Sequence, residues 1–235
     1  MDIKDLRCTD KTKFFAKDKI QLIDILLNKT RKVGNNYKIL SVGSGTAEEL
    51  AVLNNYGEVY AIDIDKEVLK FAKCCKEIKI CDVCILEYPD KFFDIVVAFD
   101  VLEHIEDDKK AVEQIYRVLS KNGVFVFTVP AFNFMFSSHD KFLGHKRRYN
   151  KKMLKRLLCK FNKFDLFFYH YIPFLPMVLF RILRKPTKIS SDFELLPKPV
   201  FVFLHIISQL ELFLLSKLNF KFKLFGLTIY GIAYR

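Results

Sequence analysis

Short apolar runs alternate with amphipathic stretches along the first half of the chain. The apolar runs are rich in β-branched and aromatic residues and occupy residues 38–43, 59–65, 77–82, 93–100 and 123–130. Stretches with helical spacing separate them, at residues 46–56, 66–75 and 107–120. Strands that alternate with helices in this way are typical of a parallel sheet with crossover helices. The pattern therefore predicts one such sheet as the core of the molecule.

The flanking regions add two strands and several helices. Amphipathic helices are indicated over residues 13–33 and 150–159. Two further apolar runs, residues 164–171 and 227–234, have the length of strands. The stretch between these two runs is rich in Phe and Leu, and Pro residues interrupt it. Its helical candidates are residues 175–184 and 199–217.

The length of the chain limits the number of domains. With 235 residues and a hydrophobic content of 51%, the chain can bury a sizeable core, but two separate enzymatic domains would be cramped. We therefore expect a single domain. Its predicted parts are an N-terminal helical cap (1–37), a core (38–172), a helical insertion (173–224) and a last strand (225–235).

Positive charge is concentrated in one stretch. The formal net charge is +12, and residues 131–163 contain seven lysines and three arginines against one aspartate. Such clustering indicates an anionic partner, for example a membrane surface or an acidic substrate, and the Phe/Leu helices of the insertion would suit docking to an anionic bilayer. A biased composition without functional meaning is the alternative, and both interpretations stay open. Nucleic acid is not expected, because no aromatic and basic RNA-binding motif is present.

The N-terminal residues and the cysteines bear on the compartment. The first residues are charged and contain no apolar signal segment, and Pro or charged residues interrupt the longest apolar runs. We expect a cytoplasmic protein, with peripheral contact to the inner face of the membrane as one interpretation. The spacing of Cys81 and Cys84 matches half of a zinc site, but no second pair accompanies them, so no metal is expected.

Two motifs at strand ends predict a nucleotide-type ligand. Gly43 and Gly45 lie in a turn between the first predicted strand and a helix, where glycine lets the backbone approach a ligand. The dinucleotide motif GxGxxG is incomplete, because Glu48 occupies the third glycine position. Asp63 ends the second strand, where a carboxylate can accept hydrogen bonds from both hydroxyls of a ribose. These motifs fit an adenosine-type ligand, and a nicotinamide dinucleotide would satisfy them equally well.

Further segments resemble one particular family. VGSGT (42–46), AIDID (61–65), CD (81–82), FDVLEHI (99–105) and RVLSKNGVFVFTVP (117–130) occur in the order and at the spacings of class I S-adenosylmethionine-dependent methyltransferases, of the type 11 superfamily that includes quinone-biosynthesis enzymes. The resemblance implies an α/β, Rossmann-like seven-stranded sheet, mostly parallel with an antiparallel terminal strand, here with a helical hydrophobic insertion before the last strand. It also implies S-adenosylmethionine as the cofactor.

The resemblance assigns predicted cofactor contacts to residues at strand ends. They are Gly43 and Gly45 for the methionine part, Asp63 for the ribose, Ile64, Asp82 and Val83 for the adenine, and Phe99 and Asp100 near the sulfonium. The chain departs from the family at Ser41, where an acidic residue usually orients the amino group of the cofactor.

Residues 130–150 form the predicted acceptor loop, because ligands of such sheets bind beyond the carboxyl ends of the strands. The loop also resembles the SxHD…GHxRRY segment of bacterial methyltransferases of this type. His139 and His145 are the candidate catalytic bases, with His139 preferred because Asp140 is adjacent. Alternatively, both histidines only brace the loop.

The predicted function is methyl transfer from S-adenosylmethionine, with oxygen as the preferred acceptor atom, on a small or lipid-linked molecule. Methylation of nucleic-acid bases is disfavoured, because the Pro-Pro-aromatic motif of such enzymes does not follow the fourth strand. Two alternative functions remain open. One is an NAD-dependent oxidoreductase, and the other is a membrane-associated module that binds a nucleotide without turnover.

Overall fold

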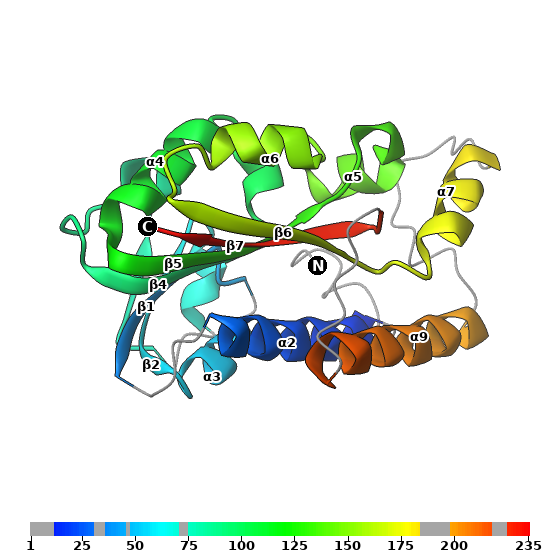
Figure 1. Ribbon diagram of the computed structural model, residues 1–235, viewed down its shortest axis with the longest axis horizontal. Coiled ribbons are helices and arrows are strands. Elements are labelled where there is room, and N and C mark those ends of the chain that lie inside the picture. Colours follow the sequence, from blue (N-terminus) through cyan, green and yellow to red (C-terminus); the bar gives the residue numbers. More distant parts are fainter. Residues whose placement is uncertain (1–11, 31–35, 46–47, 71–74, 184–197, 218–224) are drawn as a thin grey trace.

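A seven-stranded sheet forms the centre of the molecule (Figure 1). The computed structural model describes residues 12–30, 36–45, 48–70, 75–183, 198–217 and 225–235. The strands are β1 (Tyr37–Val42), β2 (Gly57–Asp63), β3 (Glu77–Ile80), β4 (Phe93–Phe99), β5 (Leu119–Pro130), β6 (Lys163–Tyr169) and β7 (Thr228–Tyr234).

The strand order is β3-β2-β1-β4-β5-β7-β6, and β7 is antiparallel to both of its neighbours. The other strands described pair in parallel. The predicted fold class is therefore confirmed, including the antiparallel terminal strand.

Both faces of the sheet are buried, which explains the continuous apolar runs in the sequence. Successive residues of a strand point to opposite faces. Leu40 and Val96 thus belong to one hydrophobic core, and Ile39 and Ile95 belong to the other. Helices cover both cores, so the sheet is the middle of three layers.

The helices divide between the two faces of the sheet (Figure 1). One core contains residues of α4 (Asp108–Val118) and α6 (Lys151–Leu157), and the other contains residues of α2 (Thr12–Lys29), α3 (Glu48–Leu53) and α9 (Lys198–Lys217). The remaining helices are α5 (Ser138–Leu143), α7 (Phe174–Leu183) and the short 3₁₀ segments η1 (Lys66–Lys70), η2 (Val83–Ile85), η3 (Leu102–His104) and η4 (Asn133–Met135).

Several elements differ from the prediction in their bounds or in their type. The helix predicted to end at residue 120 ends at Val118, and β5 begins immediately at Leu119, because Leu119 pairs with Phe93 before a register shift. Residues 66–70 of the predicted helix 66–75 form a 3₁₀ turn, and residues 71–74 lie outside the described residues. The short helix α5 lies within the predicted acceptor loop, where the sequence pattern indicated none.

The predicted insertion contains α7 and α9, and its long helix packs beside the N-terminal helix α2 (Figure 1). Buried polar contacts fix this arrangement. Gln209 of α9 donates a hydrogen bond of 2.6 Å to Asp18 of α2. Glu211 of α9 accepts hydrogen bonds from the backbone N–H groups of Tyr171 and Ile172. The division of the chain into cap, core, insertion and last strand stays a prediction.

Part of the basic stretch and the apolar insertion helix α9 lie on opposite faces of the sheet. α6, which carries part of the basic stretch, covers one face, and α9 covers the other (Figure 1). Arg148 of the same stretch, by contrast, lines a cavity together with Leu204 of α9. Of the helices in the described part of the chain, none combines the length and the apolar character needed to cross a bilayer.

A buried carboxylate organises the loop after β5. Asp140 of α5 accepts hydrogen bonds from Nδ1 of His145 at 2.8 Å, from Nε of Arg148 at 2.7 Å and from the backbone N–H of Ser137 at 2.8 Å. Arg181 of α7 lies 3.7 Å from the same carboxylate. Burial raises the pKa of Asp140, but the hydrogen bond from His145 and the charge of Arg148 outweigh it, so the pKa lies below its usual range. The loop and the insertion are thus joined through one charged group.

Replacing this carboxylate should cost stability in a pH-dependent way. At pH 7, Asp140→Asn should lower the free energy of unfolding by about 3–5 kcal/mol, because Arg148 loses its buried counter-charge. A carboxyl group whose pKa is depressed on folding stabilises the protein above its unfolded pKa of about 4, and this contribution is lost as the pH falls further. The difference between the two proteins should therefore shrink at pH 3, as measured by urea unfolding.

Asp90→Asn is the matched control, because Asp90 forms an exposed ion pair with Arg117. The control should change stability by less than about 0.5 kcal/mol. An equal loss for Asp140→Asn at pH 7 and pH 3 would contradict the charged role of Asp140.

Candidate active site

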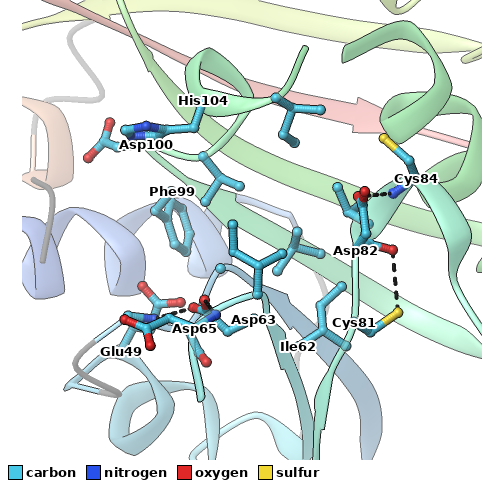
Figure 2. Close-up of a pocket in the computed structure, with 18 of the residues that line it drawn as sticks. Glu49, Ile62, Asp63, Asp65, Cys81, Asp82, Cys84, Phe99, Asp100 and His104 are labelled. Carbon is cyan, nitrogen blue, oxygen red and sulfur yellow. Dashed lines mark hydrogen bonds between the residues drawn. The ribbon is translucent and has the colours of Figure 1, made fainter. Parts of the chain in front are cut away.

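A cavity of about 760 Å³ opens at the carboxyl ends of β1, β2 and β4 (Figure 2). The sheet order changes direction at β1, and ligands of open α/β sheets bind at such switch points. All eight residues predicted to contact the cofactor line this first cavity: Gly43, Gly45, Asp63, Ile64, Asp82, Val83, Phe99 and Asp100. The structure thus brings the predicted residues together, and their individual roles stay predictions.

In the turn after β1, glycine residues present backbone without side chains to the cavity. Gly43 and Gly45 have φ angles of +71° and +53°, a conformation that side chains disfavour. A Cβ atom on Gly43 would also come within 2.6 Å of a methyl group of Val101. The turn therefore requires glycine at this position, as expected where a backbone approaches a ligand closely.

Asp63 closes this turn at the end of β2. Its carboxylate accepts hydrogen bonds from the N–H groups of Gly45, at 3.1 Å, and of Asp65, at 2.9 Å. A carboxylate offers about four acceptor positions, so two positions remain for the hydroxyls of a ligand. The neighbouring Ile64 exposes 77% of its surface at the cavity, where an apolar side chain can contact a flat ring. The geometry fits a ribose with an attached base.

Asp82 lies across the cavity from this turn (Figure 2). Its side chain caps η2 by accepting a hydrogen bond of 2.8 Å from the N–H of Cys84. Burial raises the pKa of Cys84 to about 11 and also raises that of Cys81. Both side chains are therefore neutral thiols at pH 7.

A lysine and an aspartate meet at the inner end of the first cavity. Nζ of Lys19, from α2, donates to the carbonyl of Phe99 at 3.2 Å and lies 3.5 Å from the carboxylate of Asp100. Asp100 has a φ of +56° and is held by Thr128, whose hydroxyl donates to its carboxylate. Burial lowers the pKa of Lys19, but the charges of Asp100 and the nearby acidic residues raise it above its usual value. Lys19 is therefore charged where it enters the cavity.

A second cavity of about 210 Å³ adjoins the first. Lys19, Asp100 and Leu143 line both cavities. The other residues that line the second cavity come from the loop after β5, from the end of β6 and from the insertion helices; they include Glu103, His139, His145, Arg148, Tyr169, His170, Met177, Arg181 and Leu204. Both candidate bases and part of the insertion thus surround one small space beyond the sheet.

Of the two candidate bases, His145 is the one that pairs with Asp140. Nδ1 of His145 is engaged by this hydrogen bond, and its other ring nitrogen, Nε2, lies 4.0 Å from a carboxylate oxygen of Glu103. His139 is also buried. The adjacency of His139 and Asp140 in the sequence suggested that these two form the pair, but consecutive residues of a helix point in different directions.

Two residues of this region escaped the sequence analysis as site residues. Glu103 is fully buried, and neither of its carboxylate oxygens accepts a hydrogen bond from the residues that the structure describes. Burial and the charge of Asp100 raise the pKa of Glu103 well above its usual value. Glu103 follows the fourth strand, and this position could have marked it as a site residue, whereas no sequence motif marks Lys19 in its amphipathic helix.

Glu103, His104 and His145 also place one potential metal-ligand atom each within 4.8 Å of one another.

Comparisons with known proteins agree with this geometry. The family model of a methyltransferase domain matches residues 40–127. An uncharacterised protein of Methanocaldococcus jannaschii is 35% identical over 94 residues, which are 39% of this chain and 36% of that protein. Phosphoethanolamine N-methyltransferase 3 of Arabidopsis thaliana is 29% identical over 39% of this chain and 20% of its own length. The matches thus span well under half of these two relatives.

Similarity of structure extends over most of the chain. A crystal structure of a SAM-dependent methyltransferase from Archaeoglobus fulgidus aligns with a TM-score of 0.58 at 19% identity, covering 92% of this chain and 94% of that one. At this identity the alignment supports the fold alone. The matched family model identifies residues 40–127 as a methyltransferase domain, and the strand order is that of the class I S-adenosylmethionine-dependent methyltransferase fold.

Proposed function

We propose that this protein transfers a methyl group from S-adenosylmethionine to an oxygen atom of a small or lipid-linked acceptor. The observation that carries the proposal is the pair of adjoining cavities, which meet at Lys19 and Asp100 at the carboxyl end of β4. The first has the size and the contacts for the cofactor. The second lies where an acceptor would have to reach the methyl group.

In this proposal, the residues of the first cavity hold the cofactor by its separate parts. The glycine turn admits the methionine part, Asp63 accepts hydrogen bonds from the ribose hydroxyls, and Ile64 and Asp82 contact the adenine. Bound S-adenosylmethionine supplies an activated methyl group on a sulfonium. Because holding reactants in line supplies a large part of the rate of such transfers, the main task of the chain is positioning.

His145 is the proposed base for the acceptor. A hydroxyl acceptor must lose its proton during transfer, and Nε2 of His145 can take it while Asp140 holds Nδ1 and stabilises the positive charge that forms. Glu103 lines the same cavity, and its two carboxylate oxygens accept no hydrogen bond from the described residues, so it can contact the polar end of the acceptor. Burial lowers the pKa of His170 to about 4, so this lining residue stays neutral.

Apolar residues of the insertion support the proposal that the acceptor has an apolar part. Met177 of α7 and Leu204 of α9 line the second cavity. The outer surface of α9 also exposes Phe203, Ile206 and Leu210. These positions support the extension of the proposal to a lipid-linked acceptor.

Transfer to nitrogen is the second candidate function. It is favoured by the Arabidopsis relative, whose name states that it methylates nitrogen. A buried, unpaired carboxyl group such as Glu103 would also suit an amine, because an amine donates hydrogen bonds. Assaying a panel of small phenols, carboxylic acids and primary amines with radiolabelled S-adenosylmethionine distinguishes the two functions.

Removing the carboxylate of Asp63 should weaken cofactor binding. Hydrogen bonds to charged groups contribute about 1.5–3 kcal/mol, so Asp63→Ala should raise the Kd for S-adenosylhomocysteine by about 10- to 100-fold. The same loss is expected for 5′-methylthioadenosine, which shares the ribose. Isothermal titration calorimetry measures both values. Asp165→Ala, in β6, is the control, and unchanged binding by Asp63→Ala would refute the ribose contact.

Replacing the two histidines separately should distinguish their roles. His145→Gln should lower the rate of methyl transfer to an accepted substrate of the panel by about 100-fold or more, because a positioned base contributes a factor of about 10² to 10⁴. The Kd for S-adenosylhomocysteine should stay unchanged. His139→Gln should lower the rate by less than about tenfold on the same scale. A larger effect at His139 than at His145 would overturn the assignment of the base.

A further inference from the structure

Glu49 places a buried carboxylate in the wall of the first cavity (Figure 2). It lies in the first turn of α3 and exposes 7% of its surface. The hydroxyl of Ser41, in β1, donates a hydrogen bond of 2.6 Å to Oε1 of Glu49. Ser41 is itself fully buried, so the strand fixes the position of the carboxylate.

The surroundings of Glu49 compensate its charge only in part. Burial raises the pKa of Glu49, and the charge of Lys19 and the hydrogen bond from Ser41 oppose this without cancelling it, so the pKa remains above its usual value. The close contacts of Nζ of Lys19 are with the carbonyl of Phe99 and the carboxylate of Asp100. A buried carboxylate is stabilised most by a cation within contact distance. The wall of the cavity therefore favours a ligand that brings positive charge to this point.

The proposed cofactor has such a charge in a suitable part of its structure. Its methionine part ends in an ammonium group and a carboxylate, and the glycine turn that would admit this part precedes α3 in the sequence. Gly43 and Gly45 line the cavity together with Glu49, whereas Asp82 lies at the end of another strand. The carboxylate of Glu49 is thus on the methionine side of the cavity.

We propose that Glu49, positioned by Ser41, binds the ammonium group of the methionine part of the cofactor. The inference rests on the proposed function, because it assumes that S-adenosylmethionine occupies the first cavity. The strand residue Ser41 supplies no charge of its own. It acts as a positioning residue, and the charge comes from the helix that follows the turn.

Two ligands that differ in the methionine part test this proposal. S-adenosylhomocysteine carries the ammonium group, and 5′-methylthioadenosine has the same adenosine and sulfur without it. Glu49→Gln keeps the shape of the side chain and removes the charge. It should raise the Kd for S-adenosylhomocysteine by about 10- to 100-fold and change the Kd for 5′-methylthioadenosine by less than about twofold. Isothermal titration calorimetry with the full chain gives both values without any activity assay.

Further variants separate the charge from the shape of the site. Glu113→Gln, which breaks an exposed ion pair with Lys160, is the matched control and should change neither Kd. Ser41→Ala keeps the carboxylate of Glu49 but removes the hydrogen bond that positions it. This variant should weaken the binding of S-adenosylhomocysteine only, and by less than Glu49→Gln does. The double variant Ser41→Asp/Glu49→Gln moves the carboxylate to the partner residue. It should recover most of the lost affinity, because the two side chains are in contact.

The outcomes that overturn the proposal are distinct from failure of the proposed function. Equal weakening of both ligands by Glu49→Gln would mean that the residue only shapes the cavity. Unchanged binding of both ligands by the variant would mean that Glu49 does not contact the methionine part. If the unmodified protein bound neither ligand, the proposed function itself would fail, and the role of Glu49 would fail with it.

Discussion

The hydrogen bond from the backbone of Gly45 to the carboxylate of Asp63 joins the ends of the first two strands, and the rest of the candidate site depends on it. It holds the turn after β1 in a conformation that needs glycine, with the backbone facing the cavity. Because β4 lies on the other side of β1, the segments after these two strands diverge, with α3 on one face of the sheet and α4 on the other. The first cavity is the space that this divergence leaves, and η2 forms its far side.

Charge distribution gives this cavity its chemical character. Eight carboxylates line it, Glu49, Asp63, Asp82 and Asp100 among them, against the ammonium groups of Lys19 and Lys110. Such an excess of acidic groups in a partly enclosed space favours a cationic ligand. A sulfonium compound with an ammonium group meets this requirement, and a nicotinamide dinucleotide, with its two phosphates, would meet repulsion. Electrostatics therefore separates two ligands that the strand-end motifs alone left equally acceptable.

The second cavity depends on a different constraint, the buried charge network around Asp140. The network joins α5, the segment that follows it and the insertion helix α7, which are distant in the sequence. A buried network is stable only when every member is satisfied, so these segments hold one another in place. The same contacts orient His145 toward Glu103. The stability of the loop and the proposed position of the acceptor thus both depend on the carboxylate of Asp140.

The sequence by itself determined the sheet, because apolar periodicity defines strands and the carboxyl ends of parallel strands meet at one edge. The residues alone pointed to Gly43, Gly45 and Asp63, and the resemblance to a family supplied the other five residues around the first cavity. Glycine at the turn and Asp63 at a strand end could therefore be placed in one site without coordinates. Only the tertiary structure paired Asp140 with His145, and Ser41 with Glu49, and brought Lys19 to Phe99 across 80 positions of the chain. Such contacts depend on how helices pack and which way their side chains point, and periodicity in a sequence does not encode either.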